Sequence, residues 1–180
     1  MIDYQEVNAA QAQQALPELC ELLQSCAAAG ASVGFIDAAD GGAINSFWQE
    51  RVHAIASQQT RLLAARAAGR IVGTVMVNYV DIPNGRHRAE VSKLLVHPQA
   101  RRQGIARRLM QQAEAQAQAA GRSLLVLDTR SGDVASDLYL SLGWQIAGSI
   151  PYYAESTEGA FDATTLMYKI LIQGKSVGSP

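Results

Sequence analysis

The sequence predicts an α/β fold with a mixed central β-sheet, and two patterns carry this prediction. An apolar strand at Ala89–Val96, an Ala- and Gln-rich helix at Ile105–Ala120 and a second strand at Ser123–Asp128 follow one another. A strand, a crossover helix and a second strand form a right-handed unit with parallel strands. Two apolar runs within Arg61–Val80, separated by AAGR, are typical of an antiparallel hairpin. Together they indicate a mixed sheet flanked by about four helices.

The N-terminal part is expected to supply one strand and two helices. The first seven residues alternate weakly between apolar and polar types, and the next segment, about Ala10–Ala29, has apolar residues at helical spacing. Gly30 ends this helix. Gly41 and Gly42 mark a loop, after which Ile44–Ser57 restores the helical spacing.

Turn residues separate the elements of the middle part. The hairpin is expected to turn near Gly69, and Ile82–Gly85 forms a loop before the parallel unit. Gly121 closes the long helix of that unit, and a short helix at about Val134–Leu142 ends at Gly143.

Two late strands, at about Gln145–Ile150 and Thr164–Ile172, complete the predicted fold. A chain of 180 residues is most simply one domain, which we place at residues 1–172. The polar tail at residues 173–180 is expected to be frayed.

The charge balance argues against several classes of function. The chain has 15 Lys and Arg against 16 Asp and Glu, a net charge of −1, which argues against a nucleic-acid-binding or membrane-surface protein. Cys20 and Cys26 are poorly placed for a disulfide and too few for a zinc site. The sequence has no signal-peptide pattern and no apolar segment of membrane-spanning length. We therefore expect a soluble cytoplasmic protein with reduced thiols.

Four arginines surround one glycine in the stretch VHPQARRQGIARRLM. Arg101, Arg102, Arg107 and Arg108 flank Gly104 between the first parallel strand and its crossover helix, where α/β sheets bind ligands. A helix N-terminus leaves backbone N–H groups unpaired and favours anions, and glycine lets an anion approach the backbone. The loop therefore predicts a site for a compact polyphosphate. The alternative is a solvated helix start whose arginines serve solubility.

Two motifs give this loop a family resemblance. RRQGIA at Arg101–Ala106, after VSKLLVHP, resembles the R/Q-x-x-G-x-G/A acyl-CoA pyrophosphate loop of the GNAT superfamily of N-acetyltransferases. LYLSLGW at Leu138–Trp144 is similar to the F-Y-x-x-L-G-F segment of that superfamily, in the same order along the chain. The resemblance implies the GNAT acyl-CoA N-acyltransferase fold, acetyl-CoA as cosubstrate and no metal.

Further segments resemble the tabtoxin-resistance branch of the superfamily, whose substrate is a β-lactam amino-acid toxin. They are GASVGF at residues 30–35, PNG at residues 83–85, RAEVSKL at residues 88–94 and LDT at residues 127–129. This resemblance implies acetylation of the primary amine of a small polar amino-acid-like substrate, with detoxification as a role. The alternatives are another amine, such as a polyamine, an aminoglycoside or a protein amine, or a non-catalytic CoA-binding sensor.

The resemblance also implies how the cosubstrate is held. The CoA phosphates would lie on backbone N–H groups of the glycine loop, and the pantetheine arm would pair with the preceding strand. Which arginine side chains meet the phosphates stays open. The implied cofactor-binding residues are Leu94, Leu95, Val96, Arg101, Arg102, Gln103, Gly104, Ile105, Ala106 and Arg107.

Three residues are implied to be catalytic. Tyr139 matches the family tyrosine whose hydroxyl donates a proton or a hydrogen bond to the leaving sulfur; its alternative role is to pack against the sheet. Glu90 and Asp128 match carboxylates that act on the substrate amine, and Asp128 lies at the strand end where ligands collect. The alternative for Glu90 is an ion pair with Arg88 or Lys93.

The amine is expected to enter between the two early helices and the late strands. The candidate substrate-binding residues are Ser32, Phe35, Tyr79 and Tyr152, with Trp48 and Tyr153 as further lining candidates. Each of these aromatic residues is also a core candidate.

The hydrophobic late strands are a candidate homodimer interface, whereas no nucleic acid or membrane partner is expected.

Two other motifs do not support a different chemistry. Gly30–Gly34 spells the G-x-S-x-G of serine hydrolases, but a helix instead of a strand is expected before it, so we interpret it as a loop. His53, His87 and His97 are scattered and do not have metal-ligand spacing.

Overall fold

The computed structural model describes residues 1–171, which form a seven-stranded sheet in the order β1-β2-β3-β4-β5-β7-β6. The strands are β1 (Ile2–Val7), β2 (Thr60–Ala67), β3 (Arg70–Tyr79), β4 (Arg88–Val96), β5 (Leu124–Arg130), β6 (Gln145–Glu155) and β7 (Phe161–Ile170). The helices are α1 (Ala9–Gln14), α2 (Leu16–Ala28), α3 (Gly41–Ala56), α4 (Ile105–Ala119) and α5 (Ala135–Ser141). Short 3-10 turns lie at Pro83–Gly85 and Pro98–Ala100. The predicted tail at residues 173–180 lies outside the described residues.

The predicted mixed sheet is confirmed. β4 and β5 are parallel, and every other neighbouring pair is antiparallel. The hairpin of β2 and β3 turns at Ala68 and Gly69, whose φ angles are 49° and 78°, a left-handed turn for which glycine has no steric penalty.

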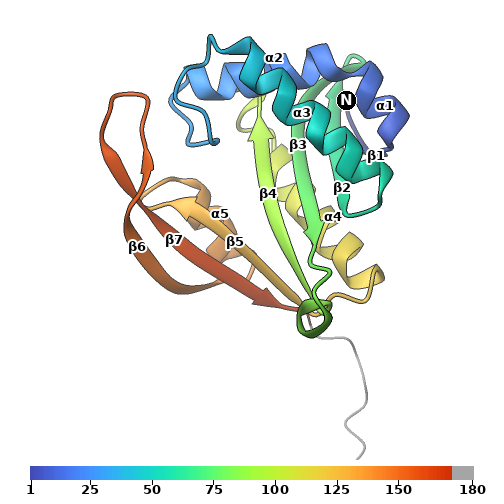
Figure 1. The fold of residues 1–180 in the computed structure, drawn as a ribbon, viewed down its shortest axis with the longest axis vertical. Coiled ribbons are helices and arrows are strands. Elements are labelled where there is room, and N and C mark those ends of the chain that lie inside the picture. The colour runs from blue at the N-terminus through green and yellow to red at the C-terminus, as the bar shows by residue number, and fades with distance from the viewer. Residues whose placement is uncertain (172–180) are drawn as a thin grey trace, which may run out of the picture.

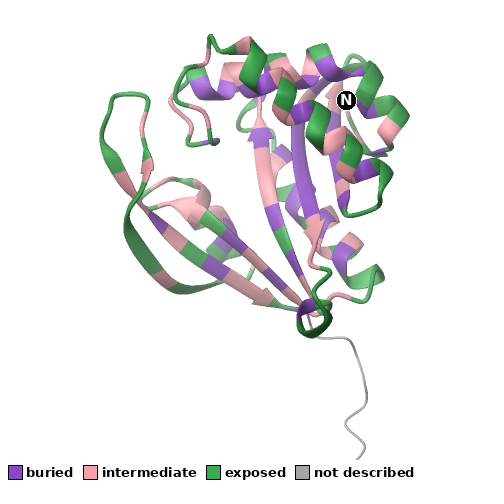
Figure 2. Ribbon diagram, in the orientation of Figure 1, coloured by how far each residue is buried: buried purple, intermediate pink, exposed green. Residues whose placement is uncertain are grey.

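Helices cover both faces of the sheet (Figure 1). Helices α1, α2 and α3 pack on one face around Leu19, Leu23 and Trp48, whereas α4 and α5 pack on the other around Leu109 and Leu125. Figure 2 shows buried residues concentrated on β2 and β3, while β6 is largely exposed. The core therefore lies along strands β1 to β5, away from the β6–β7 hairpin.

Two sequence expectations about the early helices were wrong. The helix predicted at Ala10–Ala29 is two helices, divided at Ala15, because Pro17 in the first turn of α2 has no N–H to continue α1. Gly41 and Gly42 are not a loop but the first turn of α3. The Asp40 side chain accepts a hydrogen bond from the Ala43 N–H at 3.0 Å, which starts the helix there.

The late hairpin is longer than its apolar pattern predicted. β6 runs to Glu155 and β7 begins at Phe161, so the pairing extends into exposed sequence. Register shifts between Ile146 and Gly148 and between Ile150 and Ala154 interrupt it, and such bulges disturb the apolar alternation on which strand prediction depends.

The parallel strands separate soon after they meet. β4 and β5 pair only from Arg88 to Glu90 of β4, and beyond these residues they diverge (Figure 1). β4 also contains a bulge, because Thr74 of β3 faces Leu95 while Met76 faces Ser92. The separation opens a gap in the middle of the sheet.

The structure also describes the cysteines and the apolar content of the helices. Both cysteines are free, Cys26 buried and Cys20 half-buried. Among residues 1–171 no helix is long and apolar enough to cross a membrane.

The close approach of α4 to β3 at Gly73 yields the first prediction. A Cβ at this position would lie 2.9 Å from Ile105 Cγ2 and 3.1 Å from the Leu95 carbonyl oxygen. We expect Gly73→Ala to lower the free energy of unfolding by about 1–3 kcal/mol through overpacking. Gly148→Ala is the matched control, because none of the described residues lies within 4 Å of its Cβ position. Equal midpoints of the two variants in urea unfolding would contradict this close packing.

Candidate active site

The gap between β4 and β5 is a cleft of 340 Å³. Its walls come from the β4 bulge, the end of β5, the start of α5, the loop between α2 and α3, and the β6–β7 hairpin. The polar and charged residues that line it are Ser32, Ser92, Lys93, Asp128, Thr129, Arg130, Asp133, Tyr139, Tyr153, Asp162 and Thr164. We refer to this gap as the cleft.

A second cavity of 400 Å³ lies between α3 and strands β2, β3 and β4, and we refer to it as the α3 cavity. Asn78 organises its floor: it accepts a hydrogen bond from the Thr60 hydroxyl at 2.8 Å and donates one to the Ser92 hydroxyl at 2.8 Å. Ser92 and Lys93 line both cavities, so the cleft and the α3 cavity adjoin at the β4 bulge.

The glycine loop gives α4 an uncapped N-terminus. Arg102 and Gly104 adopt φ angles of 62° and 74°, and no side chain caps the first turn of α4. No atom of residues 1–171 lies within 4 Å of the position that a Gly104 Cβ would occupy. The unpaired N–H groups and the helix dipole at this end of α4 suit an anionic group.

The arginines around this loop differ in their contacts. Arg107 donates a hydrogen bond to the Ser141 hydroxyl at 2.8 Å and thus joins α4 to α5. Arg101, Arg102 and Arg108 are exposed and form no ion pair with residues 1–171. These three guanidinium groups are free to meet an anion.

The predicted Leu94–Val96 segment lies along the unpaired edge of β4. Pairing with β5 ends at Glu90, so from Val91 onward the described chain provides no strand on that side. The Thr74 hydroxyl donates a hydrogen bond to the Lys93 carbonyl oxygen at 3.0 Å and fixes the bulge. Free backbone donors and acceptors along an extended edge can bind another extended chain, as an added strand does.

Tyr139 both packs and lines the cleft. It is buried, with its ring centroid 6.1 Å from that of Trp144. Burial and then the nearby Asp128 and Asp133 carboxylates raise the pKa of Tyr139 to about 12. The hydroxyl is therefore protonated at neutral pH and available as a donor.

Glu90 and Asp128 lie on the two separating strands. Glu90 faces Val126 in the register, two residues before Asp128, and lines the α3 cavity, whereas Asp128 lines the cleft and accepts a hydrogen bond from the Thr164 hydroxyl at 3.1 Å. Burial raises the pKa of Glu90, the Asp128 charge raises it further, and Lys93 opposes both. Glu90 forms no ion pair with other described residues, so the alternative of a simple pair with Arg88 or Lys93 is not observed.

The four predicted substrate-binding residues do not share one cavity. Ser32 lines the cleft, and Phe35 lines a smaller adjoining cavity of 190 Å³ that Ser32 also reaches. Tyr79 lines the α3 cavity, with its hydroxyl buried and without a hydrogen bond to the described residues. Tyr152 lies apart on β6, is 80% exposed and stacks on Phe161.

The two further lining candidates, Trp48 and Tyr153, also lie in different places. Trp48 is 0% exposed and belongs to the core beneath α3. Tyr153 lines the cleft.

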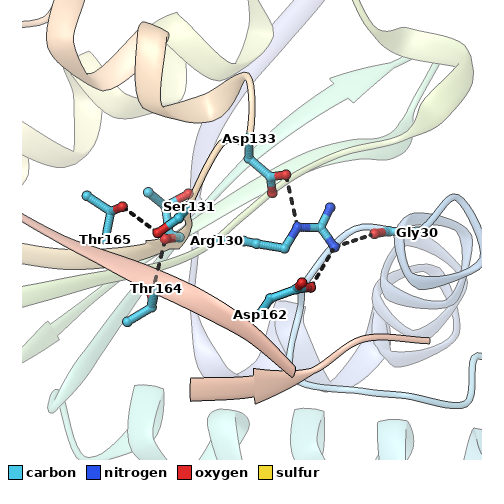
Figure 3. Close-up of polar contacts among 8 residues, drawn as sticks. Gly30, Arg130, Ser131, Asp133, Asp162, Thr164 and Thr165 are labelled. Atoms are coloured by element: carbon cyan, nitrogen blue, oxygen red, sulfur yellow. Dashed lines mark hydrogen bonds and ion pairs between the residues drawn. The ribbon is translucent and has the colours of Figure 1, made fainter. Parts of the chain in front are cut away.

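The G-x-S-x-G segment is a loop that an arginine fixes. Gly30–Gly34 follows α2 with no strand before it, in contrast to a nucleophile elbow. Arg130 donates to the Gly30 carbonyl oxygen at 3.1 Å and pairs with Asp133 at 2.9 Å and Asp162 at 3.9 Å (Figure 3). One guanidinium thus joins this loop, the start of α5 and β7.

Two cationic residues of the site were missed by the sequence analysis. Lys93 lines the cleft and the α3 cavity, and Arg51 lines the α3 cavity. A lysine inside the apolar strand AEVSKLLV was a usable signal, because a buried strand seldom carries an unpaired cation. Arg51 gave no such signal, because arginine is ordinary on an exposed helix face. Among the described residues no group of His, Cys, Asp and Glu could hold a metal ion.

A family profile matches most of the chain. Residues 16–144 match the profile of the Acetyltransferase (GNAT) family. An IAA acetyltransferase from Azospirillum brasilense is 39% identical over 75 residues, which are 42% of this chain and 47% of that protein. The match thus spans about half the length of this curated relative.

Solved structures share the fold at low identity. A phosphinothricin acetyltransferase from Sinorhizobium meliloti, in complex with acetyl-CoA, has a TM-score of 0.78 and 18% identity, covering 94% of this chain and 88% of its own. A ribosomal-protein-alanine N-acetyltransferase from Brucella melitensis has a TM-score of 0.76 and 21% identity, covering 94% and 99%. The yncA protein of Salmonella typhimurium, with its cofactor acetyl-CoA, has a TM-score of 0.77 and 18% identity, covering 100% and 99%.

The raised pKa of Glu90 leads to a prediction about stability. Above the ordinary glutamate pKa of 4.5 the folded protein must ionise Glu90 against its surroundings, whereas the unfolded chain ionises it freely, so Glu90 lowers the free energy of unfolding as pH rises. Glu90→Gln removes this effect. We expect the stability of the variant relative to the wild type to increase from about pH 4 to about pH 8 in urea unfolding. A difference that stays constant with pH would contradict the shift.

Proposed function

Because the chain belongs to the Acetyltransferase (GNAT) family, we propose that it transfers the acetyl group of acetyl-CoA to the primary amine of a small, polar, amino-acid-like substrate. The observation that carries this proposal is the unpaired edge of β4, which runs from the carboxylates of the site to the uncapped N-terminus of α4. The resemblance of segments such as RAEVSKL to the tabtoxin-resistance branch supports a β-lactam amino acid as acceptor and detoxification as the role.

The residues present fit acetyl-CoA. The open space beside Gly104 and the three unpaired arginines suit its phosphates. The free edge at Leu94–Val96 suits the amide groups of its pantetheine arm. When bound, acetyl-CoA supplies an acetyl thioester as the electrophile.

Each catalytic residue has a defined task in this proposal. Glu90 or Asp128 accepts the proton that the amine loses on attack, and the raised pKa of Glu90 brings that carboxyl closer to neutral pH, where a general base is most effective. The Tyr139 hydroxyl donates a hydrogen bond to the departing sulfur. Because a free thiol has a pKa of about 8.5 and that of Tyr139 is about 12, complete proton transfer from tyrosine to thiolate is uphill, and hydrogen-bond donation is the favoured role.

Other acceptors and a sensor role define the competing proposals. A non-catalytic CoA-binding sensor would need neither the buried Tyr139 nor the two carboxylates. Acetyltransferases for polyamines, aminoglycosides or protein amines would use the same acetyl donor. They would differ in the acceptor that the site must bind. The cytoplasmic location stays a prediction.

Pairing of two copies also stays a prediction. β6 is an edge strand, and Ile146, Ile150 and Phe161 are exposed on the β6–β7 hairpin. An exposed apolar edge is suited to association.

The anion site at Gly104 can be tested with a matched pair of glycines. Gly104 and Gly121 lie at opposite ends of α4 and have φ angles of 74° and 79°. In the described part of the chain, nothing lies within 4 Å of either Cβ position. Both glutamate variants therefore meet the same backbone strain. We expect Gly104→Glu to weaken acetyl-CoA binding about a hundredfold or more by bulk and charge repulsion, and Gly121→Glu to change it little.

Isothermal titration calorimetry with acetyl-CoA measures this difference, with ATP and NADH as ligand controls. An unchanged affinity in Gly104→Glu would remove the phosphate assignment from the loop. Failure of the wild-type protein to bind acetyl-CoA would remove the proposed function.

The role of Tyr139 predicts a separation of turnover from binding. We expect Tyr139→Phe to lower kcat about ten- to a hundredfold, because a hydrogen bond to a charged group contributes about 1.5–3 kcal/mol, with little change in the acetyl-CoA dissociation constant. Tyr168→Phe is the control, because that hydroxyl donates to Gln145 at 2.6 Å on the β6–β7 hairpin. Thiol release from acetyl-CoA with a panel of amino acids measures kcat. Equal turnover of Tyr139→Phe and the wild type would leave Tyr139 a packing residue.

A further inference from the structure

Two cations beside the candidate catalytic carboxylates have no anionic partner. Lys93 lines the cleft and the α3 cavity, and Arg51 lines the α3 cavity. Both are half-buried, and neither side chain forms an ion pair or hydrogen bond with residues 1–171. The Nε atom of Arg51 is fully buried without a partner.

Three other half-buried cations are paired with carboxylates. Arg66 lies 3.6 Å from Glu18, Arg130 lies 2.9 Å from Asp133, and Lys169 lies 2.9 Å from Glu114. Burying an unpaired charge costs free energy that a structural role would offset with a partner. Lys93 and Arg51 therefore differ from these three paired cations.

The position of Lys93 is set by its surroundings. Its Nζ lies 5.1 Å from the centroid of the Phe47 ring, and a Cβ on Gly34 would be 3.6 Å from it. The guanidinium carbon of Arg51 lies 5.8 Å from the same ring. A cation–π contact contributes about 0.5–2 kcal/mol, which orients the two cations but leaves their charge unneutralised.

The electrostatics of Lys93 agree with an absent counter-ion. Burial lowers the pKa of Lys93, Asp128 and Glu90 oppose this effect, and the Arg51 charge adds to it. Neither carboxylate reaches Lys93 as an ion pair. An anion placed between Lys93 and Arg51 would stabilise both cations at once.

We propose that Lys93, with Arg51, binds a carboxylate of the acceptor while the acceptor amine lies toward Glu90 and Asp128. This inference rests on the proposed function and assigns the residues that select the acceptor. Two cations and two carboxylates around adjoining cavities match a substrate that carries both an amine and a carboxylate. Polyamines and aminoglycosides, which carry only positive charge, would be repelled by Lys93 and Arg51.

The test compares amino acids with their carboxamides, which keep the amine and lose the charge. L-Serine and L-serinamide, and L-threonine and L-threoninamide, are such pairs; spermidine and kanamycin represent the polycations. Thiol release from acetyl-CoA gives kcat and KM for each. We expect the wild type to prefer each acid to its amide and to both polycations. In Lys93→Gln the ratio of kcat/KM for acid over amide should fall about tenfold or more, mainly through KM for the acid.

Three variants make the result specific. Lys93→Arg keeps the charge and should retain most of the ratio, and Arg51→Gln should lower it. Arg70, on the hairpin of β2 and β3, is an exposed cation that pairs with Glu21 of α2. Arg70→Gln should therefore leave the ratio unchanged. If Lys93→Gln is too unstable to bind acetyl-CoA, Arg51→Gln gives the same comparison from α3, outside the β4 bulge.

The outcomes separate the two proposals. An unchanged acid-to-amide ratio in both Lys93→Gln and Arg51→Gln, or faster acetylation of spermidine or kanamycin than of the acids, would overturn the carboxylate site while acetyl transfer stands. Binding of acetyl-CoA without turnover of any acid would also overturn it. No binding of acetyl-CoA and no turnover of any amine would overturn the proposed function and this inference with it.

Discussion

The candidate active site depends on one constraint, the early separation of two parallel strands. β4 and β5 share only three paired positions, after which β5 stays paired with β7 and β4 stays paired with β3. Backbone N–H and C=O groups that a continuous sheet would pair are thereby left along the inner edges. Because water can reach them in the cleft, the gap costs little, and an extended ligand can replace that water with hydrogen bonds.

Helix α4 stabilises both sides of this gap. Near its N-terminus, Ile105 and Leu109 lie against Gly73 of β3, which has no side chain to hold them away. One turn further on, Glu114 accepts a hydrogen bond from Trp144 at 2.8 Å and pairs with Lys169 of β7 at 2.9 Å. The helix whose N-terminus we propose to bind an anion thus also contacts strands on both sides of the gap.

Sequence patterns predicted the parallel unit, the glycine loop and the hairpin, because these follow from local periodicity and turn residues. They missed the break at Ala15 and the first turn of α3, where Pro17 and Asp40 override the pattern of their neighbours. The grouping of site residues was harder to predict. Tyr152 was expected near the substrate but lies on an exposed hairpin, whereas Lys93 lies at a bulge and lines the cleft. Bulges and strand separation are tertiary features with no local periodicity.

The charges along the site show how a net charge of −1 is compatible with the phosphate site that we propose. Unpaired arginines lie at the N-terminus of α4, and the protonated Tyr139 and Asp128 line the gap. Glu90, Lys93 and Arg51 line the α3 cavity beside it. Each group faces a different part of the reaction that we propose: phosphates, departing sulfur, attacking amine and acceptor carboxylate. Opposite charges that follow one another along the site cancel in the net charge of the protein but not locally. A charge acts most strongly within about 10 Å at ordinary salt. The order of charges is therefore more informative about the substrate than their total.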